Sequence, residues 1–260
     1  MREDAHGGQT VHVTRTAVLS DLHSNVEALD AVVAAARDRG ASGFIVCGDI
    51  VGYGADPEAV LERVFDLSLR SVVAGNHDLA AVDRFPLDWF NEVAAEALRW
   101  TAEQLPAATR ETLRGLEARE AGTEGLVVHG SVVEPASEYL MPGENAAASR
   151  SFGHESFERC FFGHTHVPTV FEQRGDGEVR GSAIQGEGRL RLAEGHRYLL
   201  NPGSVGQPRD GDPRAAFMVI DDEEAAVEWL RVQYAVETAQ QKIRAAGLPG
   251  VLADRLAVGR

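Results

Sequence analysis

Short apolar runs alternate with stretches of helical spacing through the first third of the chain. Residues 16–20 form an apolar run of strand length, and residues 26–39 repeat apolar side chains at the spacing of one helix face. Such alternation predicts parallel strands joined by helices, and therefore an α/β fold. The same reasoning predicts strands at 44–47 and 72–74 and a helix from Pro57 to about residue 67.

The pattern changes in the middle of the chain. Residues 89–104 and 106–117 have helical spacing, and strands are expected again at 125–128 and 159–162. Shorter alternating runs separated by glycine-containing turns then indicate antiparallel strands. These runs lie near residues 169–171, 190–192, 198–200, 216–220 and 227–232, before a predicted helix at 236–246 and an uninformative segment beyond Pro249.

No break in composition marks a domain boundary. We therefore expect a polar tail at 1–14 and a single domain over 15–260. Within that domain, the helical segment around 86–119 is expected either to cap a functional site or to pack into the core.

Five short polar clusters follow directly after predicted strands, and they contain five of the nine histidines. They are Asp21-Leu22-His23, Gly48-Asp49, Gly75-Asn76-His77-Asp78, His129-Gly130 and Gly163-His164-Thr165-His166. Residues beyond the carboxyl ends of parallel strands line a common crevice, so the clusters are expected to meet there. Because residues i and i+2 of an extended segment project to the same side, the first and last clusters should each aim a pair of side chains at one pocket. A glycine before Asp49, Asn76 and His164 is expected to leave room for a metal or substrate.

Imidazole nitrogens combined with carboxylate and amide oxygens suit transition metals. This donor set favours Mn, Fe, Zn or Co over Ca or Mg. One metal takes roughly four to six donors, so seven donors that share a carboxylate indicate two metals. Each cluster alone is a weak signal, since Gly-Asn favours turns and a lone histidine such as His129 is more often a core or surface residue. Their joint occurrence at five strand ends makes a dinuclear metal site the stronger interpretation.

The ordered set of clusters resembles the calcineurin-like metallophosphoesterase superfamily. G-D-I-V-G-Y-G-A-D-P and N-P-G-S-V-G-Q-P-R look like the small bacterial phosphodiesterase-like branch of that family, and the resemblance spans about residues 16–220. It implies a four-layer α/β/β/α sandwich, which agrees with the strand–helix pattern.

The resemblance also implies a role for each residue that matches the motif. Asp21, His23 and His166 would hold the first metal, Asn76, His129 and His164 would hold the second, and Asp49 would bridge both. His77 would lie near the leaving group as a proton donor or charge stabiliser. The two divalent metals, Mn²⁺ in the first place and Fe, Zn, Co or Ni as alternatives, would activate a water as the nucleophile.

Substrate contacts are less well defined by the sequence. Asn25 either contacts phosphate or caps the helix that follows, and Arg209 either orients phosphate or forms a surface salt bridge. Tyr53 and Tyr139 are able to stack on a nucleobase, although exposed tyrosines are common without a ligand.

One departure from the family pattern matters. Its protein Ser/Thr phosphatases carry G-D-x-V-D-R-G, whereas Gly52, Tyr53 and Gly54 stand here in place of D-R-G. The acidic partner of the leaving-group histidine and the phosphate-binding arginine are therefore missing from this motif. Asp78 is a candidate partner of His77 by adjacency alone.

Charge and composition narrow the function further. With 25 Lys+Arg against 40 Asp+Glu the net charge is −15, which argues against long nucleic acid or an anionic membrane as partner. Lys242 is the only lysine and no G-x-x-x-x-G-K-[ST] motif is present, which excludes a P-loop. Cys47 and Cys160 lie in apolar runs and are expected to be buried thiols. With no long apolar segment, a cytoplasmic enzyme is expected.

The sequence thus predicts a dinuclear-metal-dependent hydrolase of a small phosphodiester or phosphoanhydride, with nucleotides and diadenosine polyphosphates among the substrates. A phosphomonoesterase with the same site is the alternative within this class. A non-catalytic scaffold with this fold is the alternative outside it, and the presence of His77 with all seven ligand candidates argues against it. The oligomeric state stays open.

Overall fold

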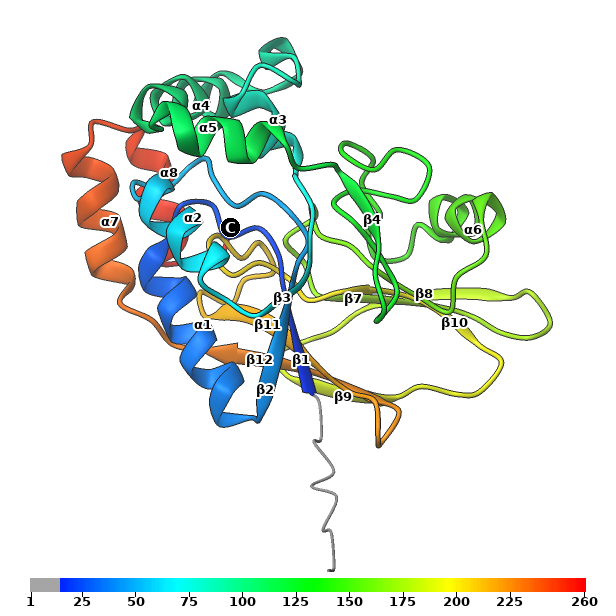
Figure 1. Cartoon of the computed structure of the whole chain (residues 1–260). Coiled ribbons are helices and arrows are strands. Elements are labelled where there is room, and N and C mark those ends of the chain that lie inside the picture. Colours follow the sequence, from blue (N-terminus) through cyan, green and yellow to red (C-terminus); the bar gives the residue numbers. More distant parts are fainter. Residues whose placement is uncertain (1–14) are drawn as a thin grey trace, which may run out of the picture.

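Two six-stranded mixed sheets pack face to face, and helices cover both outer faces (Figure 1). The computed structural model describes residues 15–260, so the predicted tail at 1–14 lies outside the described residues. The first sheet has the order β3 (Leu69–Val72), β2 (Ala41–Val46), β1 (Arg15–Leu19), β11 (Ala215–Asp221), β12 (Ala226–Val232) and β9 (Gly188–Arg191). The second has the order β4 (Arg119–Ala121), β5 (Leu126–Val128), β6 (Arg159–Phe161), β10 (Arg197–Asn201), β7 (Thr169–Gln173) and β8 (Val179–Ala183).

Each sheet contains a parallel part. Strands β1, β2 and β3 are parallel in the first sheet, as are β5, β6 and β10 in the second. The remaining neighbours pair antiparallel, as the short alternating runs predict.

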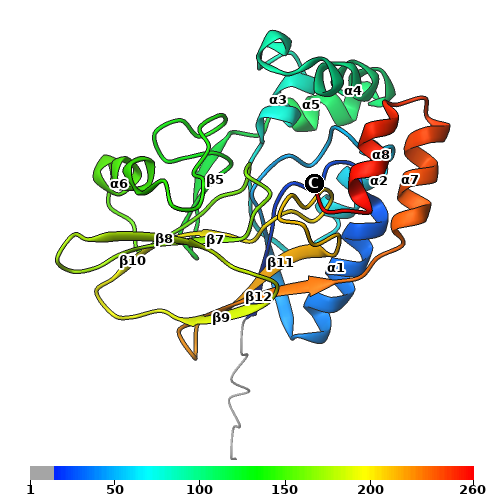
Figure 2. The same ribbon diagram turned by 180° about the vertical axis from the view of Figure 1, so that it is seen from behind.

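The helices fall into three groups (Figures 1 and 2). The first group lies on the side of the first sheet and comprises α1 (Val26–Asp38), α2 (Pro57–Phe65), α7 (Val236–Ala245) and α8 (Gly250–Leu256). Helix α6 (Asn145–His154) packs on β7 and β8 of the second sheet. Beyond the strand ends, at the top of both views, lie α3 (Asn76–Ala81), η1 (Leu87–Trp89), α4 (Glu92–Gln104) and α5 (Ala107–Arg114). No helix among residues 15–260 is long and apolar enough to cross a bilayer.

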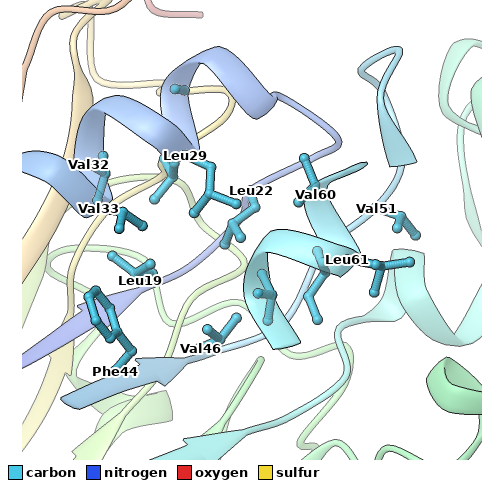
Figure 3. Packing of buried hydrophobic residues seen from close by; sticks show 14 of the residues in the cluster. Leu19, Leu22, Leu29, Val32, Val33, Phe44, Val46, Val51, Val60 and Leu61 are labelled. Carbon is cyan, nitrogen blue, oxygen red and sulfur yellow. The ribbon is translucent and has the colours of Figure 1, made fainter. Parts of the chain in front are cut away.

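Alternation along the strands builds the layers. In β1, Leu19 belongs to the apolar cluster under α1 and α2, together with Leu29 and Phe44 (Figure 3). Its neighbour Val18 points to the opposite face and joins the cluster between the two sheets, with Trp229. A side chain of this size contributes about 1.5–3 kcal/mol when it is fully buried. The period-two pattern therefore stabilises both faces of the same strand.

The predicted α/β/β/α sandwich is confirmed, and so are the predicted buried thiols: Cys47 and Cys160 are buried and free. The differences from the predicted elements are local. The third strand ends at Val72 and not at residue 74, and α3 begins four residues later, at Asn76. The sequence pattern did not predict α6, α8, β4 and β8, because these elements are short or largely exposed.

Candidate metal centre

The polar clusters converge from both sheets. Asp21 and Asp49 follow β1 and β2, and Asn76 begins α3 after β3 of the same sheet. His129 follows β5, and the cluster with His164 follows β6, both in the second sheet. The expected common crevice therefore lies along the shared edge of two sheets and not of one.

The backbone of these clusters is not extended, so the geometric premise for pairing residues i and i+2 is wrong. Asp21 and His23 nevertheless lie in one group of donors as predicted, whereas His164 and His166 do not. Asp21, His23, His164 and His166 all have φ between 47° and 67°, in the left-handed region. Non-glycine residues adopt this region at a cost of about 1–3 kcal/mol, and such residues concentrate at functional sites. Tight turns consequently send His164 and His166 into different groups of donors.

Glycines in the clusters allow neighbouring strand ends to pack closely, which differs from the expected role of leaving room for a metal or substrate. A Cβ at Gly75 would collide with the Asp49 carboxylate, and one at Gly163 would collide with the Ser20 hydroxyl. Glycine therefore lets neighbouring strand ends approach one another, and this brings the donors together.

The donors form two groups that share one carboxylate. One ligand atom from each of Asp21, His23, Asp49 and His166 lies within 4.8 Å of the others, and the same holds for Asp49, His129 and His164. The Asn76 Oδ1 atom lies 3.1 Å from His129 Nε2. The structure thus brings together the residues that the family resemblance assigns to each metal, with Asp49 between them. All seven side chains are buried, with exposed fractions of 0 to 3%.

Hydrogen bonds to backbone carbonyls orient the rings. His23 Nδ1 donates to the Val51 carbonyl over 3.2 Å, and His166 Nδ1 donates to the Gln207 carbonyl over 2.5 Å. With Nδ1 protonated, a neutral imidazole presents a lone pair at Nε2. These two Nε2 atoms face each other at 3.1 Å. Facing lone pairs repel unless a cation lies near both, so this donor set fits a metal ion.

The second group is built in the same way. His129 Nδ1 donates to the Cys47 carbonyl over 2.8 Å, and His164 Nε2 donates to the Ser137 carbonyl over 3.1 Å. Their remaining nitrogens, His129 Nε2 and His164 Nδ1, lie 3.1 Å apart. His164 therefore presents its other ring nitrogen, and both groups fit a divalent transition metal.

The histidines of the two donor groups differ in the direction in which their pKa values are shifted. Burial lowers the pKa of His164 to about 3 and the pKa values of His23 and His166 well below their usual range. Burial also acts to lower the pKa of His129, but the charge and hydrogen bond of Asp49, the charge of Asp21 and the bond to the Cys47 carbonyl together outweigh it and raise that pKa to about 9. A metal at His129 Nε2 must consequently compete with a proton.

The carboxylates respond in opposite directions. Burial raises the pKa of Asp21 to about 7, against the opposing effect of His129. Burial also favours the neutral form of Asp49, but His129 and His77 hold its pKa well below the usual range. The shared carboxylate is therefore the permanent negative charge between the two groups.

His77 lies beside the metal-type donors without being one of them. Its backbone N–H donates to Asp49 Oδ1 over 2.9 Å, and its ring packs against Tyr53, His23 and Phe90. Its Nδ1 atom is buried without a hydrogen-bond partner among residues 15–260. Burial lowers the pKa of His77 to about 4.

The missing acidic partner has no room in this chain. A Cβ at Gly52 would lie 2.5 Å from His77 Nδ1, and Gly52 has φ +91°. Asp78 does not replace it, because its carboxylate accepts N–H bonds from Ile50, Val51 and Gly75. The adjacency argument for Asp78 is therefore wrong, and its bonds instead hold the Asp49 turn against the start of α3.

The proposed substrate residues lie in different environments. Asn25 caps α1, since its Oδ1 accepts from Ala28 N over 3.1 Å, and its Nδ2 donates to the Gly206 carbonyl. The N-cap alternative is thereby confirmed. The guanidinium of Arg209 lies 5.7 Å from the centre of the Tyr53 ring and has no carboxylate within 4.0 Å among the described residues. The surface salt bridge considered for Arg209 is thus not formed.

A cavity of about 320 Å³ opens onto the donors. It is lined by Asp49, Tyr53, Asn76, His77, Trp89, Phe90, Asn91, Ala94, Tyr139, His164, His166 and Arg209. Trp89 and Tyr139 are 43% and 41% exposed there, so the core-packing interpretation of Trp89 is wrong. The helical spacing could not predict that Trp89 lies next to the site, because Trp89 belongs to the short η1 turn and not to α4.

A sandwich of two sheets with two groups of buried metal-type donors at its edge agrees with the fold and site that the family resemblance implies. The chain belongs to the calcineurin-like phosphoesterase superfamily, whose domain profile matches residues 15–224. Membership implies a phosphoester hydrolase with metal-binding residues.

Individual relatives extend over nearly the whole chain. Uncharacterized protein MJ0912 of Methanocaldococcus jannaschii is 37% identical over 249 residues, which cover 94% of this chain and 98% of that protein. The crystal structure of a metallophosphoesterase from Sphaerobacter thermophilus is 39% identical with a TM-score of 0.83, covering 95% of this chain and 100% of that one. The hypothetical protein PH1004 of Pyrococcus horikoshii OT3 shares the fold, with a TM-score of 0.76 at 20% identity over 95% of this chain and 99% of that one.

Metal content tests the two groups separately. After loading with Mn²⁺ and dialysis, we expect about two ions per chain, about one in His166→Ala and in His164→Ala, and fewer than one in Asp49→Ala. Elemental analysis by mass spectrometry provides the count. His154→Ala, an exposed histidine of α6, is the matched control. Two ions retained in Asp49→Ala would contradict the bridging role.

The Asp78 bonds can be tested through stability. Asp78→Ala leaves three buried N–H groups without their acceptor, so we expect the free energy of unfolding to fall by about 3 kcal/mol. Urea unfolding measures this, with Asp66→Ala at an exposed site as the control. A loss no larger than that of the control would show that these bonds do not hold the turn.

Proposed function

We propose that this protein hydrolyses a small phosphodiester or phosphoanhydride at two divalent metal ions held by the two donor groups. The observation that carries the proposal is the pair of buried donor groups around Asp49, open to a cavity of about 320 Å³. Manganese is the first metal to test, because the mixed imidazole, carboxylate and amide donors suit it. When bound, such ions polarise phosphoryl oxygens and lower the pKa of water.

The side chains of this chain supply the remaining steps. His77 lines the cavity beside Asp49, where a ring N–H can donate to the leaving oxygen. Arg209 also lines the cavity and would bring a positive charge to the phosphate. It would thereby serve in place of the arginine that is missing at Tyr53.

Aromatic side chains favour a nucleotide among small phosphates. Tyr139 stacks on the His164 ring at 3.8 Å, and Trp89 lies nearly parallel to Tyr139 with ring centres 6.4 Å apart. Both residues line the cavity and are partly exposed, and bases stack on such rings with about 1–3 kcal/mol each. Tyr53, by contrast, is buried against His23 and His77, which leaves it to shape the cavity wall.

The same cavity would also accept a phosphomonoester, which is the alternative substrate class. The net charge of −15 disfavours long nucleic acid and anionic membranes as partners. On the basis of its composition, we propose that the enzyme lies in the cytoplasm.

Hydrolysis of bis-p-nitrophenyl phosphate by the manganese-loaded protein tests the proposed activity. Release of p-nitrophenol above the rate of the Asp49→Ala variant supports it. No hydrolysis of this diester, of monoesters, of cyclic nucleotides or of dinucleoside polyphosphates, with metals bound, would rule the activity out and favour the scaffold.

Replacement of His77 separates its role from metal binding. We expect His77→Ala to lower kcat by about 100-fold or more on a diester with a poor leaving group, with metal content close to that of the unmodified protein. The effect should be smaller on bis-p-nitrophenyl phosphate, because its leaving group needs little protonation. His154→Ala is again the control, and an unchanged rate on the poor leaving group would disprove the role.

The aromatic wall is tested with inhibitors that differ only in the base. We expect Trp89→Ala to raise the inhibition constant of AMP by about 10-fold and that of ribose 5-phosphate by less than about twofold. Phe65→Ala, an equally exposed aromatic residue on α2, serves as the control. Equal effects on both inhibitors would mean that Trp89 does not contact the base.

A further inference from the structure

Two arginines from distant parts of the chain meet at one amide oxygen. Arg209 Nη2 donates to Gln207 Oε1 over 3.0 Å, and Arg255 Nη1 reaches the same atom over 3.4 Å. Arg209 comes from the loop after β10 and Arg255 from α8, near the end of the chain. Two guanidinium groups therefore lie side by side with only a neutral acceptor between them.

These two positive charges have no negative partner. Among residues 15–260, neither guanidinium has a carboxylate within 4.0 Å, although the chain carries an excess of acidic residues. The Nε atoms of both side chains are buried and have no hydrogen-bond partner there. Burial, and after it the charge of Arg209, lowers the pKa of Arg255. Donors and charge at this place are left for an anion.

Helix α8 holds Arg255 in position. Leu252 and Leu256 are buried in the cluster that also contains Tyr53, and Gln240 of α7 donates to the Ala253 carbonyl over 2.8 Å. Past the helix, the Gly211 N–H donates to the Gly259 carbonyl over 2.9 Å, which ties the end of the chain to the Arg209 loop. The second arginine is thus fixed by long-range packing.

The arginine pair adjoins the first donor group. Gln207, which carries the shared amide, also accepts the N–H of His166 through its carbonyl, and Arg209 N donates to the His166 carbonyl over 3.3 Å. Arg209 lines the metal-facing cavity, and Arg255, which is not among the lining residues, joins it through the shared Gln207 amide oxygen. A phosphate bound at Arg209 would thus lie near the Arg255 guanidinium, because both side chains reach the same amide oxygen.

We propose that Arg209 and Arg255 form a second phosphate subsite, so that the preferred substrate carries at least one phosphate group beyond the one attacked. This inference rests on the proposed function and narrows it to phosphoanhydrides, such as dinucleoside polyphosphates. Arg209 would serve both phosphates, whereas Arg255 would contact only the second. A simple diester would gain nothing from Arg255.

Selectivity between two substrates tests the subsite. In Arg255→Gln we expect the ratio of kcat/KM for diadenosine tetraphosphate to kcat/KM for bis-p-nitrophenyl phosphate to fall by at least about 10-fold, mainly through KM. Arg255→Lys should restore part of this ratio, since it keeps the charge and loses the planar fork. Arg244→Gln is the matched control, because it removes a positive charge from neighbouring α7, where Arg244 pairs with Asp254. An unchanged ratio, including an equal loss on both substrates, would overturn the proposal and leave Arg255 as a positioning residue at most.

A binding measurement decides the question without turnover. ADP and AMP share a base and differ by one phosphate, so we expect ADP to raise the thermal unfolding temperature of the unloaded protein more than AMP at equal concentration. This difference should disappear in Arg255→Gln and persist in Arg244→Gln. A difference retained in Arg255→Gln, or no difference in the unmodified protein, would overturn the subsite even if diester hydrolysis is found. Absence of all hydrolysis would instead defeat the proposed function, while this comparison still tests the subsite.

Discussion

The orientation of buried imidazole lone pairs is the constraint on which the rest of this structure depends. In both donor groups, one ring nitrogen donates to a backbone carbonyl and the other faces a second imidazole at 3.1 Å. In the first group His23 and His166 both have pKa values well below their usual range, so their facing nitrogens are neutral and repel, and burial removes the water that would otherwise solvate them. In the second group the raised pKa of His129 places a proton between the two rings, which a metal must displace. Bound cations relieve this repulsion, so metal binding and the stability of this edge of the fold are coupled.

The carbonyls that orient the rings come from remote parts of the chain. Cys47 and Val51 follow β2, Ser137 lies after β5 and Gln207 lies after β10. The two-sheet sandwich is therefore more than a support, because only the packing of one sheet on the other places these four oxygens around one site. The packing of the sheets also explains why the donor residues tolerate left-handed turns. The turns are held by hydrogen bonds to neighbouring strand ends, such as the bond from Asp21 N to the Gly48 carbonyl.

Local patterns predicted the elements and the donors, and long-range packing decided the rest. Apolar periodicity located β1, β2 and α1 within a few residues, because one face of each must be buried wherever it lies. The donors were predictable because polar residues after buried strands are placed at a sheet edge by any parallel topology. Which sheet each strand joins has no local signature. Nor does the docking of α8, a helix of seven residues whose Leu252 and Leu256 meet Tyr53 across the fold.

The net negative charge and the arginine pair would act together on the choice of substrate if the proposed subsite is correct. At physiological ionic strength a surface charge is screened within about 8–10 Å, so the net charge of −15 repels an extended polyanion along its whole contact while a small anion inside the cavity experiences mainly the nearby groups. Those groups are Arg209, Arg255 and the two metals that the donor groups fit. On the proposed function, a net acidic protein whose two guanidinium groups have no carboxylate partner among residues 15–260 would select phosphate compounds by size. Short phosphoanhydrides would suit such a site, because they are small enough for the cavity and carry more than one negative phosphate for the two arginines.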